Sequence, residues 1–193
     1  MTRNELEDMA RLAEKHDIYL LTDEIYSRMI YGDHDFYSPA MHDACLERTI
    51  LINGFSKAFA MTGWRLGAVV GPTDVIEKMG LLLQTTSSCV PTFIQRAGQY
   101  VLENDLESVR RMMTAYRDRI DYMFESLNEL PGITCVKPEG AFYLFANITK
   151  TGMSSYGFAT FALEKAGIAL LPGNNFGRNG EGFVRICCAI SME

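Results

Sequence analysis

A lysine and an arginine stand eight residues apart in the segment GFSKAFAMTGWRLG, residues 54–67. The lysine, Lys57, follows an apolar run at residues 49–52 that has the composition of a buried strand. A lysine amine placed just after a strand, with the fixed cation of Arg65 nearby, suits covalent capture of an aldehyde cofactor that carries a phosphate. A pair of solvated surface cations on a glycine-bounded loop is the alternative interpretation.

A second apolar run is also followed directly by residues that could do chemistry. Residues 18–22, IYLLT, are typical of a short buried parallel strand, and they lead directly into Asp23, Glu24, Ile25 and Tyr26. In open α/β sheets, ligands bind beyond the carboxyl ends of the strands. We therefore expect Asp23 and Lys57 to face one site.

Both segments resemble those of the class I/II pyridoxal-phosphate (PLP) aminotransferases of fold type I, in particular the bacterial aspartate-aminotransferase-like subgroup. The resemblance implies that Lys57 forms a Schiff base with PLP and then moves a proton between the substrate's α-carbon and the cofactor. It implies that a buried Asp23 keeps the pyridine nitrogen protonated, and that Tyr26 donates to the phenolic oxygen. Arg65 would bind the cofactor phosphate, because a guanidinium binds phosphate bidentately.

One position departs from the family pattern. Gly54 stands where many members carry a Ser or Thr that bonds the phosphate, and Ser56 is the nearby hydroxyl that could replace it.

The run GFVRICC at residues 182–188 places a single arginine, Arg185, inside an apolar alternation typical of a strand. A charge at such a position needs a partner, and an edge-strand arginine reaching solvent is the alternative. Two further segments, PEGAFY at 138–143 and LLPGNNFG at 170–177, are also similar to the family. The resemblance implies that Arg185 binds the α-carboxylate shared by amino acid and 2-oxo acid substrates.

Composition is that of a globular protein, with 193 residues, 48% hydrophobic and 22% charged. The net charge of −6 argues against a nucleic-acid partner. No apolar run approaches the roughly 18 to 20 residues of a membrane span. Five cysteines, odd in number and without Cys-x-x-Cys spacing, favour a reducing cytoplasm. The three histidines form no ligand pattern, so no metal is expected.

Periodicity predicts an α/β region at 1–100 and an α+β region at 101–193. The resemblance implies that the first is a partial PLP-binding large domain with a parallel or mixed sheet and that the second is the C-terminal small domain. Thr2 and Glu5 have the spacing of a helix capping box. The boundary falls inside one long helix. Expected strands are 18–22, 49–52, 66–70, 133–136, 142–147, 168–171 and 183–187; expected helices start near residue 74 and cover 93–130 and 154–166.

The resemblance extends over only the C-terminal half of the family fold, because the glycine-containing phosphate loop, the aromatic residue that stacks on the cofactor and the Asn-Pro motif do not occur here. We therefore expect an exposed strand edge beside residues 18–22, self-association as a homodimer or larger assembly, weak PLP binding and little turnover by this chain alone. A C–S lyase or decarboxylase of the same fold, or the effector domain of a MocR-type regulator, are the alternatives to a transaminase.

Overall fold

Two sheets, one of three strands and one of four, form the centres of two separate units of the chain. The structure is a computed structural model that describes residues 1–32, 35–43, 47–104 and 106–191. The units are Met1–Val109 and Arg110–Glu193. Where the sequence predicts one helix over 93–130, the structure has two, α3 (Thr92–Asn104) and α4 (Leu106–Glu129), and residue 105 lies outside the described residues.

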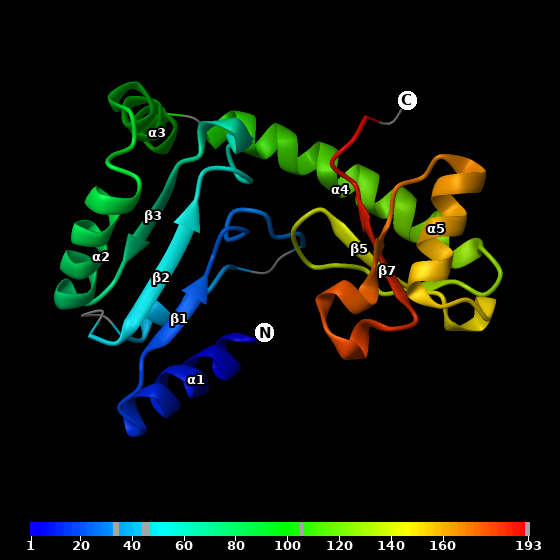
Figure 1. The fold of residues 1–193 in the computed structure, drawn as a ribbon, viewed down its shortest axis with the longest axis horizontal. Helices are drawn as coiled ribbons and strands as arrows, with labels where there is room; N and C mark the ends of the chain where they lie inside the picture. Colours follow the sequence, from blue (N-terminus) through cyan, green and yellow to red (C-terminus); the bar gives the residue numbers. More distant parts are fainter. Residues whose placement is uncertain (33–34, 44–46, 105, 192–193) are drawn as a thin grey trace. The chain divides into compact units, whose positions relative to one another are not determined.

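The sheet of the first unit has the order β1-β2-β3, with β2 in the middle (Figure 1). Strands β1 and β2 are parallel, with Leu20 opposite Thr49 and Asp23 opposite Ile52, whereas β2 and β3 are antiparallel. The predicted edge position of β1 is confirmed, and its Leu21 side chain is 62% exposed. The strands are β1 (Leu20–Asp23), β2 (Thr49–Gly54) and β3 (Gly67–Val70).

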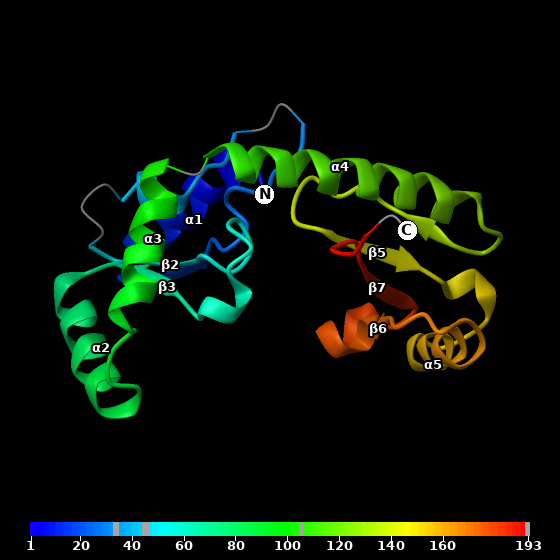
Figure 2. The ribbon, with the colours of Figure 1, turned by 90° about the horizontal axis from the view of Figure 1, so that it is seen from above.

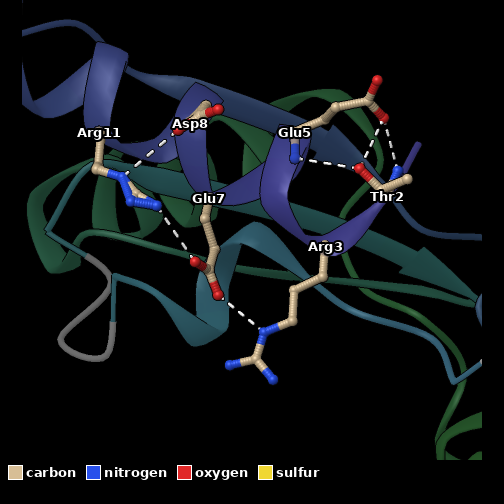
Figure 3. A network of polar contacts seen from close by, with 6 residues as sticks. All are labelled: Thr2, Arg3, Glu5, Glu7, Asp8 and Arg11. Carbon is tan, nitrogen blue, oxygen red and sulfur yellow. Dashed lines mark hydrogen bonds and ion pairs between the residues drawn. The ribbon is translucent and has the colours of Figure 1, made fainter.

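Helix α1 (Arg3–Lys15) begins at the predicted capping box (Figure 3). The Thr2 hydroxyl accepts a hydrogen bond from the Glu5 N–H at 3.4 Å, and a Glu5 carboxylate oxygen accepts one from the Thr2 N–H at 2.7 Å. One turn further on, Glu7 accepts from Arg3 at 2.8 Å. The two bonds of the capping box satisfy backbone N–H groups that the start of the helix leaves without partners, whereas the Arg3–Glu7 bond joins two side chains.

Helix α2 (Thr73–Thr86) follows β3 in the first unit. Two apolar side chains of this helix are open to solvent, because Leu82 is 62% exposed and Leu83 is 47% exposed. Together with Leu21 of β1, these side chains leave apolar surface of the first unit open to solvent.

The start of β2 is fixed by one carboxylate. Asp43 accepts hydrogen bonds from the backbone N–H groups of Arg48 and Thr49, each at 2.9 Å, and of Glu47 at 3.1 Å. Burial by itself would raise the pKa of Asp43, but these N–H donors outweigh it and lower that pKa below its ordinary value. The charged carboxylate therefore stabilises the entry into the strand.

The second unit contains a four-stranded antiparallel sheet in the order β4-β5-β7-β6, with α4 and α5 (Ser155–Ala166) beside it (Figure 2). Successive side chains along β5 and β7 point to opposite faces of the sheet. Leu144, Ala146 and Val184 are almost fully buried. Ala146 and Val184 line an apolar cavity of about 270 Å³ bounded by α4, α5 and the sheet. The strands are β4 (Thr134–Cys135), β5 (Tyr143–Asn147), β6 (Leu171–Pro172) and β7 (Phe183–Cys187).

Replacement of Asp43 by alanine should lower the free energy of unfolding at pH 7 by about 1 to 3 kcal/mol, because three backbone donors lose a charged acceptor. The folded pKa is depressed, so this contribution is present above the ordinary Asp pKa of 3.8 and disappears as the pH falls through the lower folded value. Urea unfolding at pH 7 and pH 3 measures both effects. Asp8→Ala on the exposed face of α1 is the control, and an equal loss in both variants would contradict the role of Asp43.

Candidate active site

The carboxyl ends of β1 and β2 lie side by side because the two strands are parallel and in register. Asp23 is the last residue of β1 and pairs with Ile52, and the ladder continues as the Glu24 N–H donates to the Ile52 carbonyl at 2.8 Å. Strand β2 then ends at Gly54, three residues before Lys57. The structure thus brings Asp23 and the segment of Lys57 to the same end of the sheet.

A tight turn follows β1. The Asp23 carboxylate accepts from the Ile25 N–H at 3.2 Å, and the Tyr26 carbonyl accepts from the N–H of Met29, which is fully buried. Tyr26 is half-buried. Asp23 itself is exposed, although its expected role calls for a buried carboxylate. It lies on the same face of β1 as Leu21, which is 62% exposed, so this face of the strand is open in the described structure.

The carboxylate next to Asp23 was not singled out by the sequence and is the buried one. Glu24 is only 6% exposed and accepts from the Ser38 hydroxyl at 2.5 Å and from the Thr22 hydroxyl at 3.3 Å. It thereby links the end of β1 to the segment at Ser38. In the sequence, the only sign of this buried carboxylate is the pair of adjacent acidic residues at 23–24.

The turn after β1 contacts the last two residues of β2. The Asn53 amide donates to the Ser27 hydroxyl at 3.2 Å. A Cβ added at Gly54 would lie 3.3 Å from the Ile25 Cδ1 atom, tighter than ordinary contacts. The Ile25 side chain would therefore have to shift slightly to admit a side chain at Gly54. The half-buried Ser56 is the next hydroxyl along the segment.

The Lys57 segment folds back on itself through main-chain hydrogen bonds. The Phe55 carbonyl accepts from Phe59 at 3.3 Å and from Met61 at 3.4 Å, and the Phe55 N–H donates to the Leu66 carbonyl at 3.2 Å. Met61 is 6% exposed, so it anchors the loop in the core. Lys57 is half-buried within this frame.

Two residues of the loop have left-handed backbone conformations that non-glycine residues rarely adopt. Ala60 has φ of +53° and Arg65 has φ of +54°. Such conformations cost on the order of 1 to 3 kcal/mol each and cluster at functional sites. The exposed Arg65 donates one guanidinium hydrogen bond, at 3.0 Å, to the Thr62 carbonyl. Most of its five N–H donors therefore remain for an anion.

Helix α3 packs against the base of the loop through a glycine. A Cβ at Gly98 would overlap the Leu66 Cδ2 atom and lie 3.5 Å from the Phe55 ring. Leu66 and Phe55 are the residues whose backbones close the loop. The absence of a side chain at Gly98 thus lets the helix backbone support both ends of the loop.

A cavity of about 150 Å³ lies behind the loop. Neither Asp23 nor Lys57 lines it, so it is a packing gap and not the expected substrate pocket. Its lining residues are Arg28, Asn53, Gly54, Phe55, Ala58, Phe59, Ala68 and Leu102.

Arg185 belongs to the second unit and lies on β7, between β5 and β6. The edge-strand interpretation of this arginine is therefore wrong. Its guanidinium carbon lies 4.4 Å from the centre of the Tyr143 ring and 4.2 Å from that of Phe176. Among the described residues, no carboxylate forms an ion pair with Arg185. The half-buried charge is held by aromatic rings.

Other kinds of site find no support in the described part of the chain. There, no group of three or more His, Cys, Asp or Glu residues could hold a metal ion, and no helix is long and apolar enough to cross a membrane. His34 and Cys45 lie outside the described residues. Burial raises the pKa of the Cys188 thiol to about 11, which keeps it unreactive. The described cysteines, all free, are Cys89, Cys135, Cys187 and Cys188.

A mixed sheet with a lysine loop at its carboxyl end, followed by an α+β unit, matches the fold of type I aminotransferases over about half of their chain. The chain belongs to the family described as aminotransferase class I and II, whose model matches residues 1–193. It is 43% identical over 195 residues to an aspartate aminotransferase of Pyrococcus abyssi, and 42% identical to aromatic-amino-acid aminotransferase 2 of Thermococcus litoralis. Each match includes 100% of this chain and 50% of the relative.

Solved structures agree with this assignment. An aromatic aminotransferase from Pyrococcus horikoshii OT3 matches 99% of this chain, with a TM-score of 0.94 and 42% identity. The aspartate aminotransferase of Thermus thermophilus with maleate matches 98%, with a TM-score of 0.88 and 36% identity. This chain covers 52% and 49% of those chains, so it spans about half the length of the relatives it matches.

The packing of α3 on the loop is testable with a pair of helical glycines. Gly98→Ala should destabilise the protein relative to Gly80→Ala, because a Cβ at Gly80 meets nothing within 4 Å whereas one at Gly98 overlaps Leu66. We expect Gly80→Ala to gain about 0.5 to 1 kcal/mol from helix propensity, and Gly98→Ala to lose about 1 to 3 kcal/mol to overpacking. Urea unfolding measures both. Equal stabilisation by the two substitutions would show that α3 does not support the loop.

Proposed function

We propose that this chain carries the lysine-bearing part of a PLP-dependent transaminase, which moves an amino group from an amino acid to a 2-oxo acid. The observation that carries the proposal is the parallel pairing of β1 and β2, because it sets Asp23 and the Lys57 segment at one end of the sheet. The names of the relatives, which are aspartate and aromatic-amino-acid aminotransferases, support the same reaction. One amino acid and one 2-oxo acid are consumed, and one of each is formed. The exchange therefore needs no net oxidant and no water.

The donor set of the first unit fits PLP chemically. A carboxylate, a phenol, an amine and a guanidinium match the pyridine nitrogen, phenolic oxygen, aldehyde and phosphate of the cofactor. When bound, PLP supplies an electron sink for negative charge at the substrate's α-carbon. In the proposal, Asp23 holds a proton at the pyridine nitrogen, Tyr26 donates to the phenolic oxygen, and Arg65 and Ser56 hold the phosphate.

Lys57 has two roles in the proposal. Its amine links covalently to the cofactor aldehyde, and after displacement by the substrate's amino group it takes the proton from the substrate's α-carbon. The hydrogen-bonded frame of the loop restricts the backbone on which this side chain moves. Such positioning is a main source of rate enhancement in proton transfer.

Arg185 is the proposed ligand of the substrate α-carboxylate. Donor and acceptor share this group, so one arginine serves both halves of the reaction. Its guanidinium is not engaged by any carboxylate of the described residues, which leaves its charge for the substrate.

The proposal places the protein in the cytoplasm as a homodimer or larger assembly. The free cysteines of the described residues favour a reducing compartment. The edge strand β1 and the exposed leucines of α2 offer a surface on which a second copy could pack.

Covalent capture of the cofactor tests the role of Lys57. After incubation with PLP and reduction with borohydride, peptide mass spectrometry should find the pyridoxyl phosphate group on Lys57, because reduction fixes the bond between its amine and the aldehyde. Lys57→Ala should remove this label. Lys78→Ala changes an exposed lysine of α2 and is the matched control. Labelling spread equally over surface lysines would refute a dedicated cofactor lysine.

Product analysis tests the reaction type. Because little turnover is expected of this chain alone, the assay uses this chain fused to the half of a relative that it does not match. With PLP, an amino-acid donor such as aspartate or an aromatic amino acid, and a 2-oxo acid acceptor, we expect formation of the 2-oxo acid that matches the donor, and Lys57→Ala should abolish it. A C–S lyase would instead release a thiol or sulfide with ammonia, and a decarboxylase would release carbon dioxide. Either outcome would replace the transaminase proposal. Labelling of Lys57 without any of these products would favour the non-enzymatic effector alternative.

A further inference from the structure

Two aromatic rings contact the guanidinium of Arg185, and they come from the two sides of its strand. Tyr143 belongs to β5, which pairs with β7 on one side. Phe176 follows β6, which pairs with β7 on the other side, where Leu171 is opposite Arg185. The arginine is thus held between neighbours of β7 on the same face of the sheet.

Phe176 is itself fixed by further rings. It makes an edge-to-face contact with Phe145, at 6.1 Å between ring centres and 84° between planes. Phe145 in turn stacks on Phe183 at 5.0 Å and 8°. Phe176 is 48% exposed, so burial alone does not explain its position. The ring cluster restricts where it can lie.

The backbone that carries Phe176 is also held tightly. Gly173 and Gly180 approach so closely that a Cβ on either would overlap the backbone of the other. The buried Ser155 hydroxyl accepts from the N–H groups of Gly182, at 2.8 Å, and Phe183, at 3.2 Å. These contacts join the loop between β6 and β7 to the start of α5. Phe176 therefore stands on a rigid segment.

We propose that Tyr143 and Phe176 are positioning residues that hold the Arg185 guanidinium ready for a carboxylate. The inference rests on the proposed role of Arg185 in the transaminase. A ring face attracts the cation without using its N–H donors and without neutralising its charge. A protein carboxylate in the same place would occupy the donors that the substrate needs. Fixing the long arginine side chain in advance also reduces the entropy lost on binding.

The test uses the 193-residue chain in solution and maleate as the probe. Nuclear magnetic resonance of the Arg185 Nε–H group reports both the nearby rings, through their ring currents, and dicarboxylate binding. Phe176→Leu should reduce the ring-current shift of Arg185 and weaken maleate binding about 2- to 30-fold, which is the range of one cation–π contact. Phe176→Tyr should restore both.

Phe161→Leu is the matched control, because Phe161 lies on α5 in the same unit and is 50% exposed. It should change neither readout. If Phe176→Leu behaves like Phe161→Leu while Arg185→Leu abolishes maleate binding, the positioning role is overturned and the carboxylate role of Arg185 stands. If maleate does not bind, or binds equally to Arg185→Leu, the carboxylate role fails. An Arg185 shift unchanged by Phe176→Leu would by itself refute the ring contact.

Discussion

The parallel register of β1 and β2 is the constraint on which the first unit depends. It is fixed at both ends, by the Leu20 N–H donating to the Arg48 carbonyl at 2.9 Å and by the Glu24 N–H donating to the Ile52 carbonyl at 2.8 Å. A shift of one residue would turn each side chain of β1 to the opposite face. The Asp23 carboxylate would then leave the face on which it now stands. The position of this carboxylate relative to the lysine loop is therefore a property of main-chain pairing.

The loop after β2 combines local strain with strong support. Ala60 and Arg65 have left-handed backbone conformations, which are unfavourable for residues other than glycine. They persist because Met61 is buried between them and because α3 approaches closely enough at Gly98 to contact Leu66. Dense packing favours one arrangement over a range of similar ones. A loop built this way presents its cation in a fixed direction without needing a salt bridge.

Local patterns in the sequence predict the elements well, and long-range neighbours poorly. The strand at 183–187 and the capping box at Thr2 are confirmed because each depends on a few adjacent residues. The surroundings of Arg185 depend on strand order, which no local pattern contains. Alternation along 143–147 and 183–187 places Tyr143 and Arg185 on one face, but only if the two strands are known to pair. The sequence predicts one helix over 93–130, and the structure has helices on both sides of residue 105, which lies outside the described residues.

Arg65 and Arg185, the two arginines proposed to bind anions, form no ion pair with a carboxylate of the described residues, and the same holds for Arg28 and Arg119, which contact aromatic rings. Arg65 is held by a backbone carbonyl and Arg185 by aromatic rings, and neither partner carries a charge. A neutral partner fixes the direction of a guanidinium and leaves its charge uncompensated, whereas an acidic partner would have to be displaced before an anion could bind. The neutral partners of Arg65 and Arg185 therefore agree with the proposal that these two arginines bind a phosphate and a carboxylate. Cations that do pair with carboxylates are Arg3, Arg11, Arg48 and Lys137.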